Sequence, residues 1–130
     1  MEKAIQVFAG VSFLAIGLSH LLQPLAWVEW FSKLRALGRP GVFAEGFLTL
    51  NFGALIVAFH NIWSGPGVVL TVVGWAQVLK GLVRFLAPTA IFGVYDKMVP
   101  ERAWQFRVAG GVAIVLGAFF LWLARQNHIG

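Results

Sequence analysis

Four long runs of apolar residues divide the sequence, at about 4–22, 43–62, 67–87 and 105–124. The hydrocarbon core of a bilayer is roughly 30 Å thick, and an α-helix needs about 20 mostly apolar residues to cross it. Each run therefore predicts one membrane-spanning helix, and the four helices together take up most of the chain.

Three shorter segments connect these runs. The second and third runs are joined by the sequence NIWSGPG at 61–67, whose glycines and proline end one helix and start the next. A turn this tight makes the second and third helices antiparallel neighbours. The other two connections, at 23–42 and 88–104, are longer and of roughly equal length.

Both long connections have an amphipathic pattern. Apolar residues recur at helical spacing in each, more strongly in the first, and they are Trp27, Trp30, Phe31 and Leu34 in the first and Ile91, Phe92, Tyr95 and Met98 in the second. This pattern predicts two short interfacial helices whose apolar sides lie on the lipid headgroups. We expect them to act as anchors that set the tilt of the spans, rather than as partner-binding helices.

A shift of 64 residues aligns the chain with itself without a gap. The identities place Gly10, Gly17, Leu18, Leu22, Pro24, Ala26 and Lys33 on Gly74, Gly81, Leu82, Leu86, Pro88, Ala90 and Lys97, and Gly46, Gly53 and Ala54 on Gly110, Gly117 and Ala118. We interpret this match as a duplication with units at about 4–62 and 67–124, each containing a span, an interfacial segment and a return span.

The predicted fold is therefore an all-α membrane protein, a single transmembrane domain over residues 1–130. Each unit crosses the membrane twice, so both units have the same orientation. The four-transmembrane-helix bundle would then consist of two parallel repeats related by a pseudo-twofold axis along the membrane normal.

Every predicted span carries two glycines seven residues apart. The pairs are Gly10 and Gly17, Gly46 and Gly53, Gly74 and Gly81, and Gly110 and Gly117. Seven residues correspond to two turns along one side of a left-handed helix pair, and small residues let helix backbones approach closely in lipid. We therefore predict that these glycines form helix-packing seams, and we favour this over a glycine-lined permeation path.

Composition and charge agree with a membrane protein and predict its orientation. Hydrophobic residues make up 59% of the chain and charged residues 12%, with a mean hydropathy of +0.81. Most of the Lys and Arg residues lie in or beside the two long connections: Lys33, Arg35, Arg39, Lys80, Arg84, Lys97, Arg102 and Arg107. The positive-inside rule then predicts that both long connections lie in the cytoplasm and both termini outside.

Polar residues gather at the predicted cytoplasmic ends of the spans. They are His20, Glu45, Gln77, Lys80, Arg84 and Arg107. Glu45 is expected to point into the bundle and to pair with one of the three cations. One carboxylate cannot neutralise three cations, so the remaining positive charge predicts a site for an anion or an anionic lipid headgroup. An equally weighted alternative is that the cations only anchor the spans at the inner leaflet while one ion pair joins the helices.

Other residue types limit the chemistry. The chain has no cysteine, which excludes thiol and disulfide chemistry. His20 and His60 are expected at opposite ends of the bundle and His128 lies in the tail, so we expect no haem within one subunit, no metal and no other cofactor. Nothing in the sequence predicts nucleic-acid binding. Asn51, near the middle of its span, is expected to bridge helices or protomers.

The second half of the chain resembles small two-helix bacterial inner-membrane proteins of unassigned function. The residues that carry this resemblance are Gly74, Lys80-Gly81-Leu82, Pro88, Pro100, Arg107, Gly110 and Gly117. The whole chain is similar to four-helix bacterial membrane proteins with an HNxW turn followed by GW and KG. The resemblance implies a bacterial inner-membrane protein and brings no catalytic residue or substrate with it.

Three functions remain open at this point. The first is binding or transport of an anion or anionic lipid at the cationic cluster, which predicts a cavity there. The second is a non-catalytic accessory or scaffold subunit, in a homo-oligomer or a larger membrane complex, which predicts a dry bundle with Glu45 fully paired and an exposed apolar seam. The third is a membrane enzyme acting on a lipid or quinone, with Glu45 or His20 as acid or base. We place it last because two such groups are little machinery for catalysis.

Overall fold

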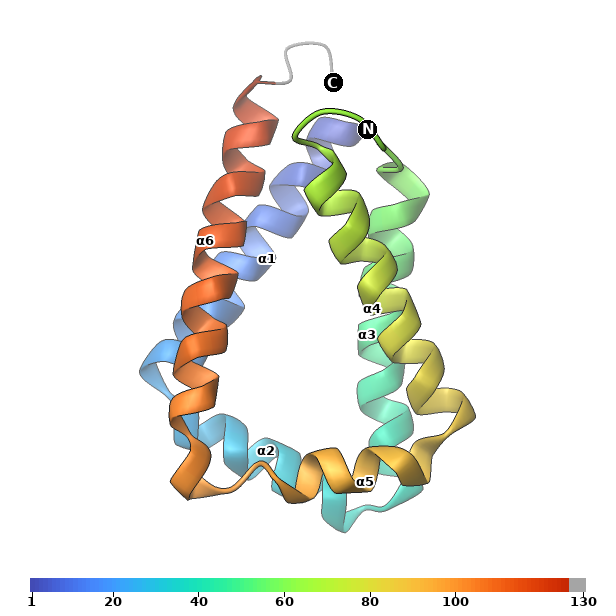
Figure 1. The fold of residues 1–130 in the computed structure, drawn as a ribbon, viewed down its shortest axis with the longest axis vertical. Helices are drawn as coiled ribbons and strands as arrows, with labels where there is room; N and C mark the ends of the chain where they lie inside the picture. The colour runs from blue at the N-terminus through green and yellow to red at the C-terminus, as the bar shows by residue number, and fades with distance from the viewer. Residues whose placement is uncertain (127–130) are drawn as a thin grey trace.

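The computed structural model describes residues 1–126, and the four longest helices in it correspond to the four predicted spans (Figure 1). These helices are α1 (Glu2–Leu22), α3 (Arg39–Phe59), α4 (Val68–Leu86) and α6 (Trp104–Gln126). Each is long and apolar enough to cross a membrane. The predicted all-α fold with four membrane-spanning helices is confirmed.

Two short helices occupy the long connections, as the amphipathic pattern predicts. They are α2 (Pro24–Ala36) and α5 (Pro88–Asp96), and a 3-10 turn, η1 (Pro100–Arg102), follows α5. Both helices begin at a proline, which fits the first helical position because it needs no backbone N–H there. Proline also disfavours helical geometry in the residue before it, so Gln23 and Ala87 form the corners after α1 and α4.

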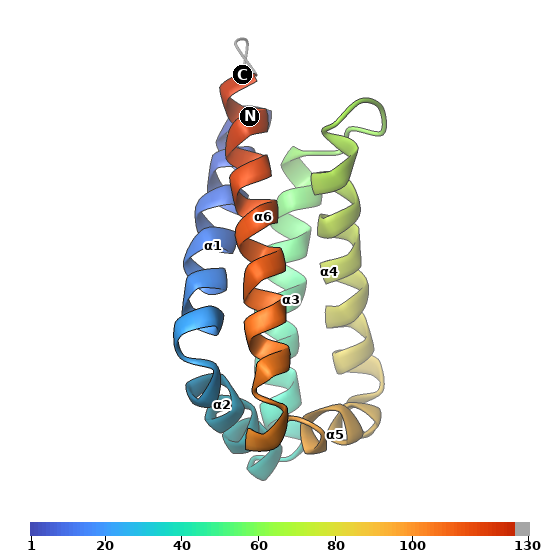
Figure 2. The same cartoon turned by 60° about the vertical axis from the view of Figure 1, so that its left-hand side comes forward.

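The four long helices form two pairs, α1 with α6 and α3 with α4 (Figures 1 and 2). The two pairs meet at the end of the molecule that carries the termini and separate toward the end that carries α2 and α5. At the closed end all four helices contribute to one core, which includes Ile5, Ile56, Leu70, Phe120 and Leu123. Burial of these side chains joins the two pairs there.

The wide end is closed by α2 and α5, which pack on each other. Their shared core contains Leu34, Ile91 and Tyr95 together with Val42 from α3. The prediction that the apolar sides lie on the headgroups is wrong for Leu34, Ile91 and Tyr95, because these side chains are buried inside the protein. These side chains leave water by packing among α2, α3 and α5, which satisfies the hydrophobic effect without contact with lipid.

All eight glycines of the predicted seams lie inside the two helix pairs. On α1 and α6, a Cβ atom added to Gly17 would lie 2.7 Å from the backbone oxygen of Gly110. On α3 and α4, a Cβ atom on Gly53 would lie 2.7 Å from the backbone oxygen of Gly74. The backbones therefore approach so closely that a side chain would not fit, and these glycines line helix contacts rather than a path for a solute.

The helix boundaries agree with the 64-residue shift. Helices α4, α5 and α6 begin at residues 68, 88 and 104, within two residues of the positions to which a shift of 64 moves the starts of α1, α2 and α3 at residues 2, 24 and 39. Under this shift α1 corresponds to α4, and α3 corresponds to α6. The pair formed by α1 and α6 therefore has its counterpart in the pair formed by α4 and α3. Each long helix thus packs mainly on a helix from the other half. The duplication and its pseudo-twofold axis stay predictions.

Candidate functional site

The buried carboxylate of Glu45, on α3, is the centre of a polar network. Its Oε1 atom accepts hydrogen bonds from Arg84 Nε at 2.5 Å and Tyr95 Oη at 2.8 Å, and its Oε2 atom accepts one from Thr49 Oγ1 at 2.6 Å. Helices α3, α4 and α5 each supply a member, so the network joins three elements. The carboxylate is fully paired inside the protein.

Sequence reasoning predicted Glu45 and a basic partner for it but missed Tyr95. Burial, and then the hydrogen bond to Glu45, raise the pKa of Tyr95 above its ordinary value. The phenol therefore stays protonated and donates to the carboxylate. Tyr95 was predicted to lie on the headgroups because its position in the amphipathic pattern does not show that α5 packs beneath α3.

The three predicted members on α4 have different environments. Arg84 is buried with Glu45, and its Nη1 atom also donates to the backbone oxygen of Lys80 at 3.2 Å. Gln77 is half-buried at the contact between α3 and α4, while the side chain of Lys80 is exposed. Only Arg84 is therefore drawn into the network.

His20 does not join this network. Its ring stacks on Trp27 with 4.1 Å between ring centroids, and its Nδ1 atom lies 2.8 Å from the backbone oxygen of Ile16. Under the 64-residue shift His20 occupies the place of Arg84, but Ala109 and Phe31 occupy the places of Glu45 and Tyr95. The prediction of one cluster containing His20 is wrong, because the ring contacts of His20 within residues 1–126 are with Ile16, Trp27 and Phe106 rather than with Glu45.

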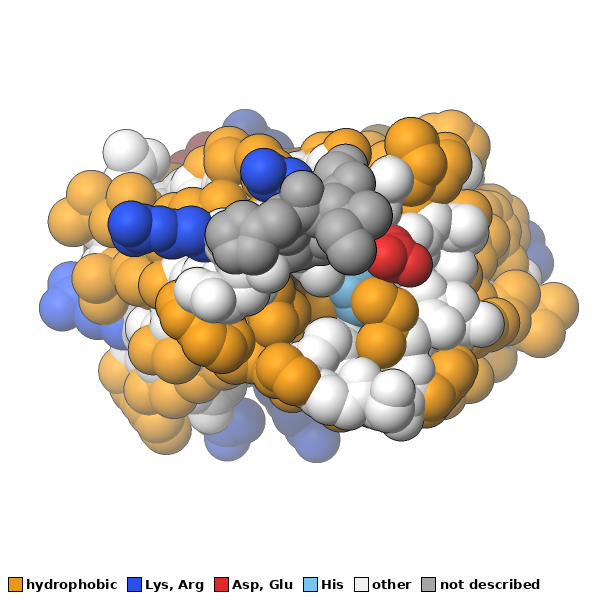
Figure 3. All heavy atoms as spheres, turned by 90° about the horizontal axis from the view of Figure 1, so that it is seen from above, with side chains coloured by type: hydrophobic (Ala, Val, Ile, Leu, Met, Phe, Trp, Pro, Cys, Tyr) orange, Lys and Arg blue, Asp and Glu red, His pale blue; other side chains and the backbone are white. Residues whose placement is uncertain are grey.

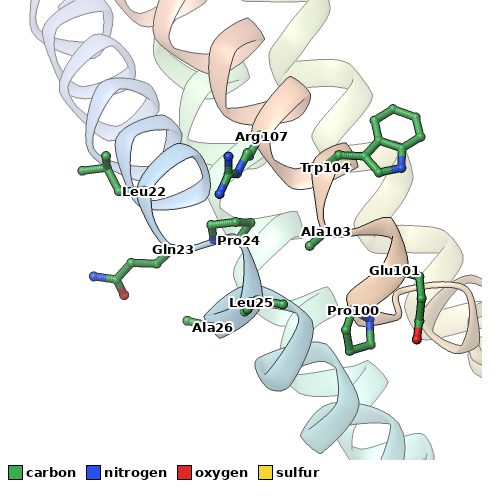
Figure 4. A pocket seen from close by; sticks show the side chains of 10 residues that line it. All are labelled: Leu22, Gln23, Pro24, Leu25, Ala26, Pro100, Glu101, Ala103, Trp104 and Arg107. Carbon is green, nitrogen blue, oxygen red and sulfur yellow. The ribbon is translucent and has the colours of Figure 1, made fainter.

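Arg107 is also separate from Glu45 and instead lines a cavity of about 640 Å³ at the wide end. The cavity lies between the corner of α1 and α2 and the start of α6, and it is lined by Leu22, Gln23, Pro24, Leu25, Ala26, Pro100, Glu101, Ala103, Trp104 and Arg107 (Figure 4). The side chain of Arg107 extends toward Pro24, and that of Glu101 points away from it. Within residues 1–126, Arg107 has no acidic group within 4 Å. The prediction of one joint cluster is therefore wrong for Arg107 as well.

A smaller cavity of about 300 Å³ lies at the same corner of α1 and α2. It is lined by Ser19, Ala26, Trp27 and Trp30, and the indole N–H of Trp27 donates to Ser19 Oγ at 2.9 Å. Neither cavity is lined by Glu45 or His20, the two groups suggested for acid–base catalysis. The cavities therefore give no support to the catalytic hypothesis.

A second buried polar cluster, at the closed end, involves His60. Its Nε2 atom lies 3.1 Å from Gln6 Nε2, and its Nδ1 atom lies 3.0 Å from Thr71 Oγ1. Thr71 Oγ1 accepts from the backbone N–H of Ile62 at 2.9 Å. Helix α3 ends at Phe59, so His60 lies beyond the span, and the cluster links α1 to the α3–α4 turn and α4.

His60 is neutral in this arrangement. Burial lowers the pKa of His60, although the nearby carboxylate of Glu2 acts in the opposite direction. The neutral ring donates from Nδ1 to Thr71 and accepts at Nε2 from the amide of Gln6. Sequence reasoning placed His60 at the outer end but missed Gln6 and Thr71, which lie on helices whose contacts the sequence did not reveal.

The closed end otherwise carries little charge. Seen from this side, apolar and uncharged groups cover most of the surface (Figure 3). Lys3 and Arg125 lie near this end, whereas the other basic residues lie toward the wide end. His128 is outside the described residues.

Comparisons with known proteins identify one related family. Residues 69–124, from the start of α4 almost to the end of α6, match the model of a family described as an uncharacterized protein conserved in bacteria (DUF2065). The predicted resemblance of the second half to a bacterial family is confirmed. No curated protein and no solved structure matches the chain.

Proposed function

We propose that this chain, whose second half matches a bacterial protein family, binds the phosphate of an anionic lipid headgroup at the inner leaflet of the bacterial inner membrane. The site is the larger cavity at the wide end, and Arg107 is the cation that contacts the phosphate. Of the predicted set of binding residues, only Arg107 belongs to this site.

The observation that carries the proposal is the position of Arg107 in a cavity between the α1–α2 corner and the start of α6. An arginine without an acidic partner can donate two parallel hydrogen bonds to a phosphate. The lining also includes Leu22, Leu25 and Trp104, which give an apolar border suited to the glycerol and upper acyl region of a lipid. Leu22 and Leu25 are 73% and 60% exposed, so this border is accessible from the membrane.

The N-terminal end of α2 adds to the positive potential of the cavity. The first turn of α2 lines it through Leu25 and Ala26, and no side chain caps that helix. The unpaired backbone N–H groups and the helix dipole at such an end favour a negative ligand, typically by 0.3–1 kcal/mol at an exposed position.

The proposal can be tested by native mass spectrometry of the detergent-solubilised protein with added phosphatidylglycerol, phosphatidylcholine or inorganic phosphate. We expect the wild type to retain phosphatidylglycerol in preference to phosphatidylcholine. Arg107→Gln should lose this preference. Arg102→Gln is the matched control, because Arg102 is an exposed cation five residues away that does not line the cavity.

The outcomes separate the sources of phosphate. Displacement of the lipid by equimolar inorganic phosphate would show that the site takes a free anion rather than a headgroup. Equal retention of both lipids by the wild type would overturn the proposal. Equal loss of the preference for phosphatidylglycerol in Arg107→Gln and Arg102→Gln would also overturn it.

A second candidate function, an accessory or scaffold subunit, is favoured by the complete pairing of Glu45. With Arg84, Tyr95 and Thr49 around it, each oxygen of the carboxylate accepts at least one hydrogen bond from the protein itself. Such a network positions α3, α4 and α5 and needs no substrate. This function would be supported if the wild type and Arg107→Gln both retain no lipid and both co-purify with the same membrane partner.

A further inference from the structure

We infer that the lipid-facing side of α3 around Asn51 is an interface for a second copy of this chain. The proposal concerns a surface at mid-span and does not depend on the headgroup cavity. It assigns a role to a polar side chain that neither buried network uses.

Asn51 lies at the centre of the exposed face of α3. At about 100° per residue, it lies roughly 160° around the helix from Gly53, which contacts α4. The exposed neighbours on the same face are Phe47, Leu48, Ala54, Leu55 and Ala58. The side chain therefore points away from the three other spans.

The amide of Asn51 is only partly satisfied within one chain. Its Nδ2 atom donates to the backbone oxygen of Phe47 at 2.8 Å. Among residues 1–126, this is the one side-chain hydrogen bond that Asn51 makes, so no group donates to its Oδ1 atom. Asn51 is the thirteenth residue of a 21-residue span, so water is scarce at its depth, and an unpaired amide oxygen there is costly.

A second copy supplies the missing partner by symmetry. An amide carries both a donor and an acceptor, so two Asn51 side chains across a twofold axis satisfy each other. Ala54 and Ala58, three and seven residues further along α3, are small enough to let the two helices approach. The equivalent face of α6 has Val115 in place of Asn51 and is not expected to associate in this way.

Disulfide trapping in native membranes tests the inference directly, because the chain contains no cysteine of its own. Ala54→Cys should give an oxidant-induced dimer. Ala118→Cys is the matched control, since it replaces the corresponding alanine on the exposed face of α6. Adding Asn51→Leu to Ala54→Cys should weaken the dimer by about 3-fold to 20-fold, the range of interhelical polar contacts in membranes.

A dimer at position 54 that exceeds the one at position 118 and declines with Asn51→Leu would support the interface. Equal trapping at both positions would indicate random collision and overturn it. Absence of any dimer with Ala54→Cys would also overturn it. A dimer that is unchanged by Asn51→Leu would contradict the role given to the amide.

Discussion

At the scale of single residues, the ion pair of the Glu45 network stabilises the fold little when it is intact, but the loss of one partner costs much more. A buried ion pair contributes little net stability, because both charges lose their hydration. Removing one partner is different, since the other charge then remains buried without compensation. Arg84 and Lys80 are four residues apart on one helix, yet only Arg84 is in this position.

We therefore predict that Arg84→Met destabilises the protein by about 3–5 kcal/mol, because Glu45 loses its charged partner. Lys80→Met, the control on the same helix, should change stability by about 0.5 kcal/mol or less. Tyr95→Phe should cost about 1.5–3 kcal/mol, as expected for a hydrogen bond to a charged group. Reversible unfolding in mixed detergent micelles would measure all three, and equal effects of Arg84→Met and Lys80→Met would contradict the prediction.

His60 gives stability a pH dependence. Its pKa is lower in the folded protein than the ordinary value of 6.5, so the unfolded chain binds more protons just below that pH. Stability is therefore fully present above about pH 6.5 and is lost as the pH falls toward the folded pKa. The thermal midpoint should decline between pH 7.5 and pH 5, and less so in His60→Gln. The same decline in both proteins would assign the effect to other groups.

The sequence predicted that Glu45 points into the bundle, but it did not predict which cation would pair with it. Arg84 and Arg107 have the same charge and a similar predicted depth. Their environments differ because they lie on different helix pairs, and that separation depends on tertiary contacts that helical spacing does not report.

At the scale of elements, the close helix contacts depend on glycine at particular positions. A Cβ atom on Gly110 would lie 2.6 Å from the backbone oxygen of Gly17 and 2.9 Å from the backbone nitrogen of Leu21. Gly111, the next residue on the same helix, has open space around it. A substitution at Gly110 therefore tests the contact between α1 and α6, whereas the same substitution at Gly111 tests helix propensity alone.

Gly110→Ala should destabilise the protein by about 1–3 kcal/mol, because α1 and α6 must move apart to admit a methyl group. Gly111→Ala should be neutral, or stabilising by up to about 1 kcal/mol through the better helix propensity of alanine. Unfolding in detergent would compare the two variants. Equal destabilisation would mean that helix geometry, rather than contact between α1 and α6, determines the effect.

Element boundaries were more predictable than the environments of the short helices. Prolines and apolar runs mark the helix ends locally, so the spans and corners follow from the sequence. The burial of Ile91 and Tyr95 against α2 depends on where α2 lies, and no local pattern contains that information. The ion pair between Arg35 Nε and Asp96 Oδ1, at 2.9 Å, joins the same two helices and was not predicted for the same reason.

At the scale of the whole molecule, the uneven placement of basic residues predicts the orientation in the membrane. With the wide end in the cytoplasm, a cysteine at position 61 should react with a membrane-impermeant maleimide in intact cells. A cysteine at position 97 should react only after the membrane is permeabilised. The reverse pattern would place the termini in the cytoplasm.

The pairing of helices was only partly predictable. The short turn between α3 and α4 makes them neighbours, and the structure agrees. The partner of α1 could not be predicted in this way, because α1 and α6 lie at opposite ends of the chain and only the glycine spacing relates them. Glycine spacing predicts that a helix has a packing face, but it does not predict which other helix packs on that face.

The pairing of the first helix with the last has a consequence for biosynthesis. When α1 leaves the ribosome and enters the membrane, the helix that will cover its glycine face has not been translated. Helix α3 cannot replace it, since few contacts join α1 and α3. The glycine face of α1 is therefore covered by α6 only after almost the whole chain has been translated, and until then that face is open to lipid or to another protein.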